Sequence, residues 1–302
     1  MWWISIWLGV RLWKGEEVLT LSAPAKINWF LHIVRKRDDG YHDIVSLMQY
    51  VTLSDTLTME HSDGIQVVSA QNIPQEENLV YKAAVLMRQL MRIKSGVRIT
   101  LKKEIPEAAG LGGGSSDAAS SLLGLSRLWN LNVAPIELAE MGKVLGSDVP
   151  FFFQGPLAMV EGRGEIVFPV RLRASYSLLL VKPLLAVSTA WAYAQLDVPS
   201  NPKVLTKKHN NITLFRQALE NGDFSLLSSL QRNDLEPHVA KRYPVIDEIK
   251  EKLMLNGAIF SSMSGSGPTV FGVFRTDKEA AKAAEGLSPN WCRVVKTVAP
   301  YS

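Results

Sequence analysis

The sequence predicts an α+β protein built from two domains. Its 302 residues are about twice the length of an ordinary domain of roughly 150 residues. Residues 18–70 have the pattern of consecutive strands, whereas helical and strand-like runs are mixed after residue 78. Near residue 170 the chain enters SYSLLLVKPL, an apolar run typical of a buried strand. We therefore expect three parts: an N-terminal extension (1–18), a first domain (19–170) and a second domain (171–302).

The first half of the chain gives its elements in a clear order. VLTLSAPAKINWFLHIV alternates apolar and polar residues and is interrupted at Pro24, which predicts two strands around a bend. Strand-like runs continue to residue 70, and a helix is expected from Asn78. VRITLKKEIP predicts a strand ending at Pro106. Beyond a glycine cluster, Ala118 and Leu122 fall on one face of a further helix.

The remaining elements are less regular. APIELAEMGKVLG predicts a helix before GSDVPFFF, and EGRGE at 161–165 predicts a hairpin bend. We expect amphipathic helices at about 212–231 and 244–255, then a helical stretch at 277–286. The run RVVKTVA predicts a final strand.

Composition excludes several classes of protein. With 47% hydrophobic and 21% charged residues, the chain is typical of a globular protein. The net charge of +4 is too small to indicate a nucleic-acid surface, yet it is compatible with an anionic substrate. The single cysteine, Cys292, excludes an intrachain disulfide and a cysteine-based zinc site. Residues 1–13 are apolar but too short to span a membrane, so we expect an extension rather than an anchor.

The glycine cluster is the first candidate functional site. Four of the 21 glycines fall within Gly110–Gly114, directly before a predicted helix start. Glycine permits a close approach of the backbone, and the first amides of a helix are free to bind an anion. A Walker loop would need a lysine near its end, and a dinucleotide fingerprint counted from Gly110 would need a glycine where Ser115 stands. Both common phosphate loops are therefore excluded.

Asp148 is the second candidate. It lies between a Gly-Ser turn and the apolar run Val-Pro-Phe-Phe-Phe, where an unpaired charge is unfavourable. Transfer of a phosphoryl group to an alcohol needs a carboxylate near the hydroxyl and cations near the phosphoryl oxygens. Asp148 and Lys26 supply these two residue types.

Three segments resemble one family. Residues 106–119, PEAAGLGGGSSDAA, are similar to the phosphate-binding motif of the GHMP kinases, named for galactokinase and for homoserine, mevalonate and phosphomevalonate kinases. PAKINWFLHI (24–33) resembles the first motif of that superfamily, and MSGSGPTVFGVF (263–274) its C-terminal glycine motif. RDDGYHDI (37–44) and GSDVPFFF (146–153) resemble the branch that phosphorylates 4-(cytidine 5'-diphospho)-2-C-methyl-D-erythritol in non-mevalonate isoprenoid biosynthesis.

The resemblance implies a fold and a set of site residues. The fold would be a two-domain GHMP kinase, with an N-terminal ribosomal-protein-like α/β domain and a C-terminal ferredoxin-like α+β domain. Asp148 would be the general base, and Lys26 would pair with it. The implied ATP-binding residues are Asn78, Lys103, Pro106, Glu107, Ala108, Ala109, Gly110, Leu111, Gly112, Gly113, Gly114, Ser115 and Ser116. The implied substrate-binding residues are Asn28, Tyr41, His42, Thr189, Tyr193, Gly265 and Gly267.

The resemblance also implies ATP as co-substrate, with Mg²⁺, for which Ser115 or Ser116 could supply a hydroxyl ligand. We expect a cytoplasmic monomer or weak homodimer that acts on a small molecule, without nucleic acid or membrane partners. Two alternatives stay open. One is another GHMP kinase of the homoserine or mevalonate type, which would not need the Tyr41–His42 pair that binds cytosine in the resembling branch. The other is a non-catalytic ligand-binding or RNA-binding module.

Overall fold

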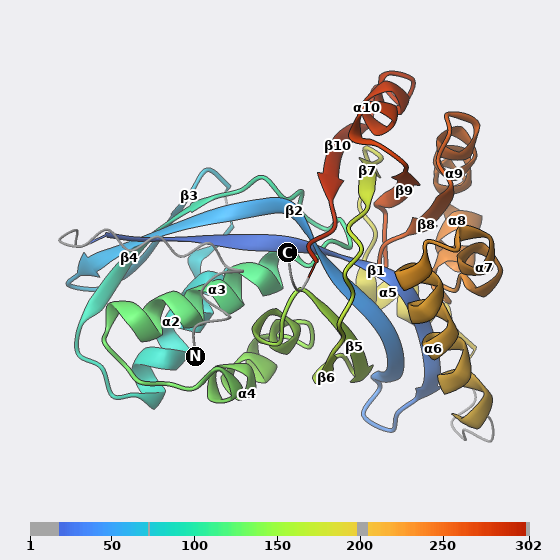
Figure 1. Cartoon of the computed structure of the whole chain (residues 1–302). Coiled ribbons are helices and arrows are strands. Elements are labelled where there is room, and N and C mark those ends of the chain that lie inside the picture. Colours follow the sequence, from blue (N-terminus) through green and yellow to red (C-terminus); the bar gives the residue numbers. More distant parts are fainter. Residues whose placement is uncertain (1–17, 72, 198–204, 300–302) are drawn as a thin grey trace.

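The computed structural model describes residues 18–71, 73–197 and 205–299, and it contains two β-sheets (Figure 1). The larger sheet has six strands: β1 (Val18–Lys36), β2 (His42–Ser62), β3 (Ile65–Ser69), β4 (Gly96–Lys102), β5 (Leu157–Gly162) and β6 (Ile166–Pro169). The smaller sheet is antiparallel, in the order β10 (Trp291–Lys296), β7 (Ser177–Lys182), β9 (Val270–Phe274), β8 (Phe260–Met263). The predicted α+β class is confirmed.

Strands β1 and β2 form a long antiparallel pair that runs across the molecule (Figure 1). The prediction of two strands around Pro24 is wrong, because β1 is continuous from Val18 to Lys36. The pairing register instead shifts between Pro24 and Lys26 and again between Asn28 and Phe30. Such irregularities accommodate a residue that lacks an N–H, and they change which side chains face a neighbouring site.

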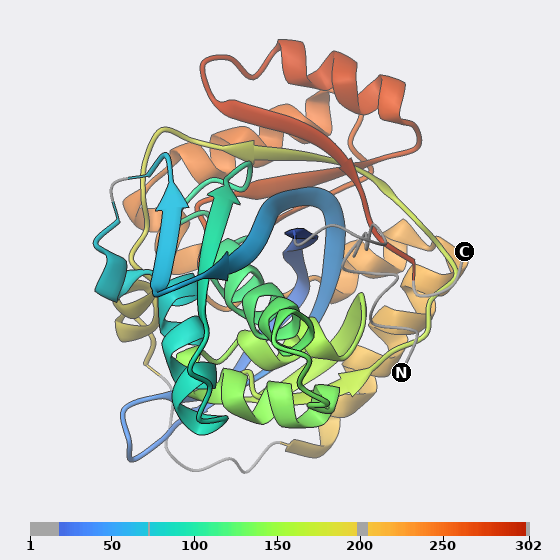
Figure 2. The same cartoon turned by 90° about the vertical axis from the view of Figure 1, so that its left-hand side faces the viewer.

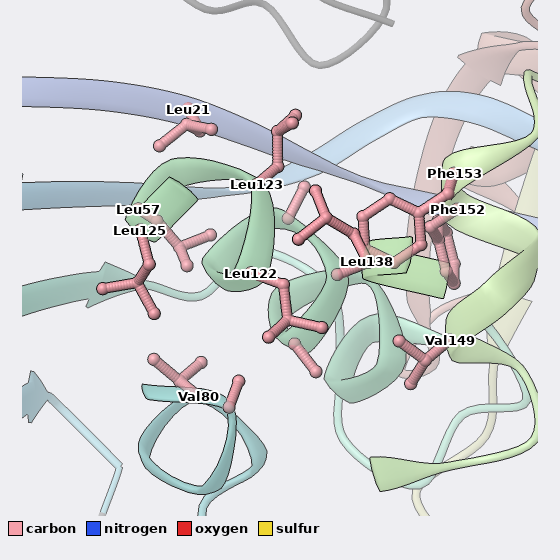
Figure 3. Close-up of a cluster of buried hydrophobic side chains, with 14 of the residues drawn as sticks. Leu21, Leu57, Val80, Leu122, Leu123, Leu125, Leu138, Val149, Phe152 and Phe153 are labelled. Carbon is pink, nitrogen blue, oxygen red and sulfur yellow. The ribbon is translucent and has the colours of Figure 1, made fainter. Parts of the chain in front are cut away.

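Helices α2 (Leu79–Leu90) and α3 (Gly113–Leu128) cover one side of the larger sheet, and α4 (Pro135–Leu145) packs against both of them. The predicted apolar face of α3 is confirmed, because Leu122 and Leu125 are fully buried there (Figure 3). Phe152 and Phe153 pack into the same cluster from the short 3-10 helix η2 (Val149–Phe153). This packing fixes the start of α3 and the turn before η2 relative to the sheet.

The second half adds α5 (Thr189–Ala194), α6 (Leu205–Asn221), α7 (Phe224–Leu230), α8 (Glu236–Arg242), α9 (Val245–Leu255) and α10 (Asp277–Glu285). The helical region predicted at about 212–231 contains the end of α6 and all of α7, which are separate because Gly222 adopts a φ of +66° and Asp223 caps α7. Helices α9 and α10 pack on the smaller sheet, and α10 lies at the outer edge of the molecule (Figures 1 and 2).

The two sheets share one hydrophobic cluster. Trp29 on β1 is fully buried and contacts Phe260 and Phe271 of the smaller sheet, with ring centroids 6.1 and 5.6 Å apart. Beyond β10 the chain returns to β2, where Val298 N–H donates to the Tyr50 carbonyl at 3.0 Å. The first sheet ends at Pro169 and the second begins at Ser177.

The proposed domain boundary at residue 170 stays a prediction. Most of the predicted N-terminal extension lies outside the described residues. Within the described ranges, none of the helices is both long and apolar enough to cross a membrane.

Candidate active site

The glycine loop leads from β4 into α3. Gly110 and Gly112 have φ values of +74° and +69°, in the left-handed region that favours glycine. Helix α3 starts at Gly113, earlier in the cluster than the sequence suggested, so Ser115 and Ser116 belong to its first turn. Among the described residues, no side chain caps this helix start. Its first amides are therefore free to bind an anion.

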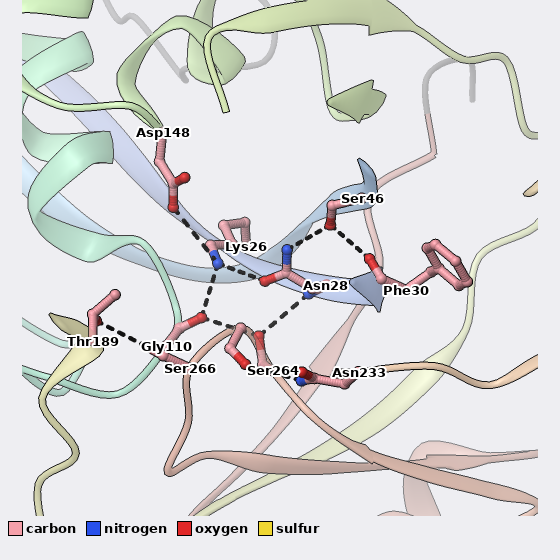
Figure 4. A network of polar contacts seen from close by, with 11 residues as sticks. Lys26, Asn28, Phe30, Ser46, Gly110, Asp148, Thr189, Asn233, Ser264 and Ser266 are labelled. Carbon is pink, nitrogen blue, oxygen red and sulfur yellow. Dashed lines mark hydrogen bonds and ion pairs between the residues drawn. The ribbon is translucent and has the colours of Figure 1, made fainter. Parts of the chain in front are cut away.

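Lys26 lies where this loop meets β1 (Figure 4). Its Nζ is 2.6 Å from Asn28 Oδ1, 3.0 Å from the Gly110 carbonyl oxygen and 3.7 Å from Asp148 Oδ2. The side chain is 5% exposed. Burial lowers the pKa of Lys26 below its ordinary value, and the Asp148 carboxylate partly opposes this effect. The lysine is thus a buried cation whose charge depends on its acidic partner.

Asp148 comes directly before η2, on a turn held by the apolar residues that follow. Val149 and Phe151 are fully buried, whereas the Asp148 side chain is 35% exposed. Its contact with Lys26, at 3.7 Å, is an ion pair and is too long for a hydrogen bond. One carboxylate oxygen can therefore accept a proton from a group in the adjacent cavity.

Asn28 extends the network from Lys26 into the fold (Figure 4). Its Nδ2 donates to Ser46 Oγ at 2.8 Å, and Ser46 Oγ donates to the Phe30 carbonyl at 2.6 Å. The Asn28 N–H donates to Ser264 Oγ at 3.3 Å, and that hydroxyl donates to the Gly110 carbonyl at 3.0 Å. Asn28 therefore orients Lys26 through contacts to β2 and to the loop that follows β8.

The C-terminal glycine loop, residues 264–267, packs directly on the first glycine loop. A Cβ atom on Gly110 would collide with the Ser264 carbonyl oxygen, and one on Gly265 would lie 3.2 Å from Lys26 Nζ. Asn233 holds the second loop, because its Nδ2 donates to the carbonyls of Met263 and Gly265 at 2.8 and 2.9 Å. Sequence reasoning missed Asn233, which has no motif around it.

Four of the predicted substrate residues lie at the start of β2, or directly before it, and on α5. His42 and Tyr193 lie together, with ring centroids 5.3 Å apart, although they come from β2 and α5. Tyr41 is 54% exposed and packs against the Arg163 guanidinium, 4.8 Å from its ring centroid. Thr189 Oγ1 lies 2.8 Å from Ser266 Oγ, so α5 is tied to the C-terminal glycine loop.

His42 and Tyr193 are both kept neutral by their surroundings. Burial, and secondarily the charge of Lys36, lowers the pKa of His42. Burial, and secondarily the charge of Asp148, raises the pKa of Tyr193 above its ordinary range. His42 Nε2 is buried without a hydrogen-bond partner among the described residues. A neutral ring pair with one free nitrogen is suited to a polar aromatic ligand.

The predicted adenosine-site residues also have structural roles. Asn78 caps α2, because its Oδ1 accepts the Val80 N–H at 2.9 Å. Lys103 Nζ donates to Asp117 Oδ2 at 2.7 Å and also to Asp55. The sequence did not single out Asp117 as a site residue. It did not single out Asp55 either, which is 48 residues away from Lys103.

A cavity of about 460 Å³ brings most of these residues together. The predicted residues that line it are Lys26, Asn28, Asn78, Lys103, all of 106–115, Asp148, Thr189, Tyr193, Gly265 and Gly267. Ser116, Tyr41 and His42 do not line it. Lining residues that the sequence did not single out include Gln71, Ile73, Glu77 and Asp117.

The oxygen donors near the glycine loop fit a magnesium ion that is bound mainly through nucleotide phosphates. Such an ion needs only one or two protein oxygens. Ser115 lines the cavity, whereas Ser116 is fully buried and does not, which favours Ser115 of the two predicted alternatives. Asp148 supplies a carboxylate in the same cavity.

Two parts of the chain match models of one protein family. Residues 78–156 match the family model of the GHMP kinases N terminal domain, and residues 215–293 match that of the GHMP kinases C terminal domain. A 4-diphosphocytidyl-2-C-methyl-D-erythritol kinase of Thermodesulfovibrio yellowstonii is 48% identical over 282 residues, covering 93% of this chain and 98% of the relative. The same-named kinase of Geobacter metallireducens is 42% identical, covering 90% of this chain and 96% of its own.

Solved structures agree with the sequence relatives. A crystal structure of 4-(cytidine 5'-diphospho)-2C-methyl-D-erythritol kinase is 33% identical, with a TM-score of 0.77, covering 91% of this chain and 98% of that chain. A homoserine kinase from Cytophaga hutchinsonii has a TM-score of 0.73 at 20% identity, covering 96% and 97%, which shows a shared fold alone. The chain belongs to the GHMP kinase superfamily and, within it, to the family of 4-diphosphocytidyl-2-C-methyl-D-erythritol kinases.

Proposed function

We propose that the protein transfers the γ-phosphoryl group of ATP to the 2-hydroxyl of 4-(cytidine 5'-diphospho)-2-C-methyl-D-erythritol, within the non-mevalonate pathway. One observation supports this more than any other. The buried cation Lys26 and the partly exposed carboxylate Asp148 form an ion pair beside two glycine loops, at the wall of one cavity. This pair supplies the proton acceptor and the positive charge that phosphoryl transfer to an alcohol needs.

The reaction follows from this geometry. The amides at the start of α3 bind the phosphates of ATP, because they have no partners within the helix. Asp148 accepts the proton of the acceptor hydroxyl while the hydroxyl oxygen attacks the γ-phosphorus and the bond to ADP breaks. Lys26 stabilises the negative charge that spreads over the transferred group. Mg²⁺, held by the phosphates and by Ser115, would neutralise further charge.

The cytosine end of the acceptor is assigned to His42, Tyr41 and Tyr193. His42 offers its free Nε2 for a hydrogen bond to the base, and the neighbouring ring of Tyr193 offers a stacking surface. Stacking of a base on an aromatic side chain contributes roughly 1–3 kcal/mol. Tyr41 does not line the cavity and packs against Arg163, so the family resemblance alone supports its assignment to the base.

We further propose a cytoplasmic enzyme, monomeric or weakly dimeric, that acts on small molecules rather than on nucleic acid or membranes. The net charge of +4 supports the small-molecule assignment, because nucleic-acid surfaces carry larger clustered positive charge.

A substrate panel tests the proposal. The purified protein is incubated with ATP and Mg²⁺ and one of four acceptors: the cytidylyl methylerythritol substrate, free methylerythritol phosphate, homoserine or mevalonate. We expect ADP release with the first alone, and a new phosphomonoester in the phosphorus NMR spectrum of the product. A strong preference for homoserine or mevalonate would overturn the choice of acceptor. Tight RNA binding without phosphoryl transfer would favour a binding module.

A further inference from the structure

Three buried charged residues lie beneath the glycine loop, and the reaction as described does not use them. Asp55 on β2, Lys103 just after β4 and Asp117 in α3 form what we call the Asp55 cluster. Their side chains are 0%, 11% and 4% exposed, respectively. Buried charges of this kind are unfavourable unless they are paired, so the cluster must have defined partners.

Asp55 fixes the chain where it leaves β4. Its Oδ1 accepts the backbone N–H groups of Glu104 and Ile105 at 2.6 and 2.8 Å, while its Oδ2 accepts from Lys103. These are the residues directly before the glycine loop. One carboxylate thus holds the entry of the loop in place on β2.

Lys103 links this entry to the exit of the loop. Its Nζ donates to Asp117 Oδ2 at 2.7 Å, and Asp117 lies near the start of α3. A Cβ atom on Gly113, the first residue of that helix, would lie 3.3 Å from Lys103 Nζ. The ammonium group therefore lies directly under the helix start, between the two ends of the loop.

The charges of the cluster argue against Lys103 as a direct phosphate ligand. Two carboxylates face one ammonium, so two of its three donors are already used. Burial disfavours the charge on Lys103, but the carboxylates outweigh burial and hold its pKa above the ordinary value. A lysine whose charge is already balanced by the buried Asp55 carboxylate attracts a polyanion weakly.

We propose that Lys103 is a positioning residue, which acts through Asp55 and Asp117 to hold the glycine loop in the shape that binds the phosphates of ATP. The inference deepens the proposed function, because it concerns how the same site binds its nucleotide. It does not depend on the identity of the acceptor.

The experiment compares Lys103→Met and Asp117→Asn with the matched control Lys102→Met. Lys102 is the preceding residue, is 74% exposed and contacts only Glu104 at 3.5 Å among the pairs described. ADP affinity is measured by titration calorimetry, and hydrogen exchange of residues 104–115 is followed without nucleotide. KM values are measured for ATP and for the acceptor.

We expect Lys103→Met to weaken ADP binding about 10-fold, to raise KM for ATP and to leave KM for the acceptor within twofold. Exchange in the unliganded glycine loop should be faster. Asp117→Asn should change the same quantities in the same direction, and the double variant should be no worse than Lys103→Met alone, because both residues act through one contact. Lys102→Met should change nothing.

Two results would overturn the inference. One is weaker ADP binding in Lys103→Met with unchanged loop exchange and with normal binding in Asp117→Asn, which would make Lys103 a direct ligand. The other is normal ADP binding in Lys103→Met. If Lys103→Met does not fold, Lys103→Arg takes its place. Lys103→Arg should keep the ADP affinity within threefold of the parent, whereas Asp117→Asn should lower it. Equal ADP affinity in these two variants would refute the inference. A parent enzyme that binds ADP but does not phosphorylate the cytidylyl acceptor would refute the proposed function alone.

Discussion

Replacing Asp148 with asparagine should separate catalysis from nucleotide binding. Asp148 Oδ2 lies 3.7 Å from Lys26 Nζ, and at an effective dielectric constant of about 20 this corresponds to an attraction of roughly 4 kcal/mol. Because the Asp148 side chain is 35% exposed, solvent screening should reduce the loss to about 1–2 kcal/mol. Lys26 keeps its contacts to Asn28 and Gly110, so the glycine loop should stay in place.

The chemical step should lose more free energy than the fold. Loss of a general base lowers turnover by about 100-fold or more, which equals roughly 2.7 kcal/mol in the barrier. The assay is kcat at saturating ATP and acceptor, with ADP affinity from calorimetry and the free energy of unfolding from denaturant titration. Asp63→Asn, an exposed carboxylate between β2 and β3, is the control. Turnover within threefold of the parent would remove Asp148 from the mechanism.

Three further predictions concern His42, Gly265 and Asp117. His42→Ala should raise KM for the cytidylyl acceptor about 10-fold with KM for ATP unchanged, since a base contact is lost; equal changes in both would place His42 elsewhere. Gly265→Ala should lower kcat at least 10-fold, because its φ is +58° and the new Cβ would lie 3.2 Å from Lys26 Nζ; normal kinetics would show that the loop adapts. Burial, with Asp55 adding to it and Lys103 opposing it, raises the pKa of Asp117 from 3.8 to about 7, so the folded protein retains a proton that the unfolded chain releases. The free energy of unfolding should therefore fall as pH rises from about 4 to 7. Asp117→Asn should flatten that slope, and an unchanged slope in denaturant titrations would assign it to other groups.

The glycine loop, Lys26 and Asp148 could be predicted because each lies within a short contiguous motif. Lys26 and Gly110 are 84 residues apart in sequence, yet each was recognisable from its immediate neighbours. Asp55 and Asn233 could not be found in this way. Their surroundings are ordinary, and their roles arise only when the fold brings them under loops 48 and about 30 residues away.

One prediction from sequence patterns was wrong because the backbone geometry at a single residue determines whether a strand continues. Pro24 suggested a break, but β1 absorbs the proline in a register shift. The grouping of Tyr41 with His42, which the resemblance implies, stays a prediction, and neighbouring residues of a strand end point to opposite sides. In the structure Tyr41 packs on Arg163, whose hairpin belongs to a distant segment.

The burial of Trp29 has a consequence for how the protein unfolds. Its neighbours Asn28 and Lys26 face the cavity, whereas the indole packs on the smaller sheet and donates through Nε1 to Gln49 Oε1 at 2.6 Å. Gln49 in turn donates to the carbonyl of Val298, beyond the last strand. One strand thus belongs to the cores of both halves, so neither half can melt while the other stays intact. Denaturation should be a single cooperative transition, and loss of the active site should coincide with it.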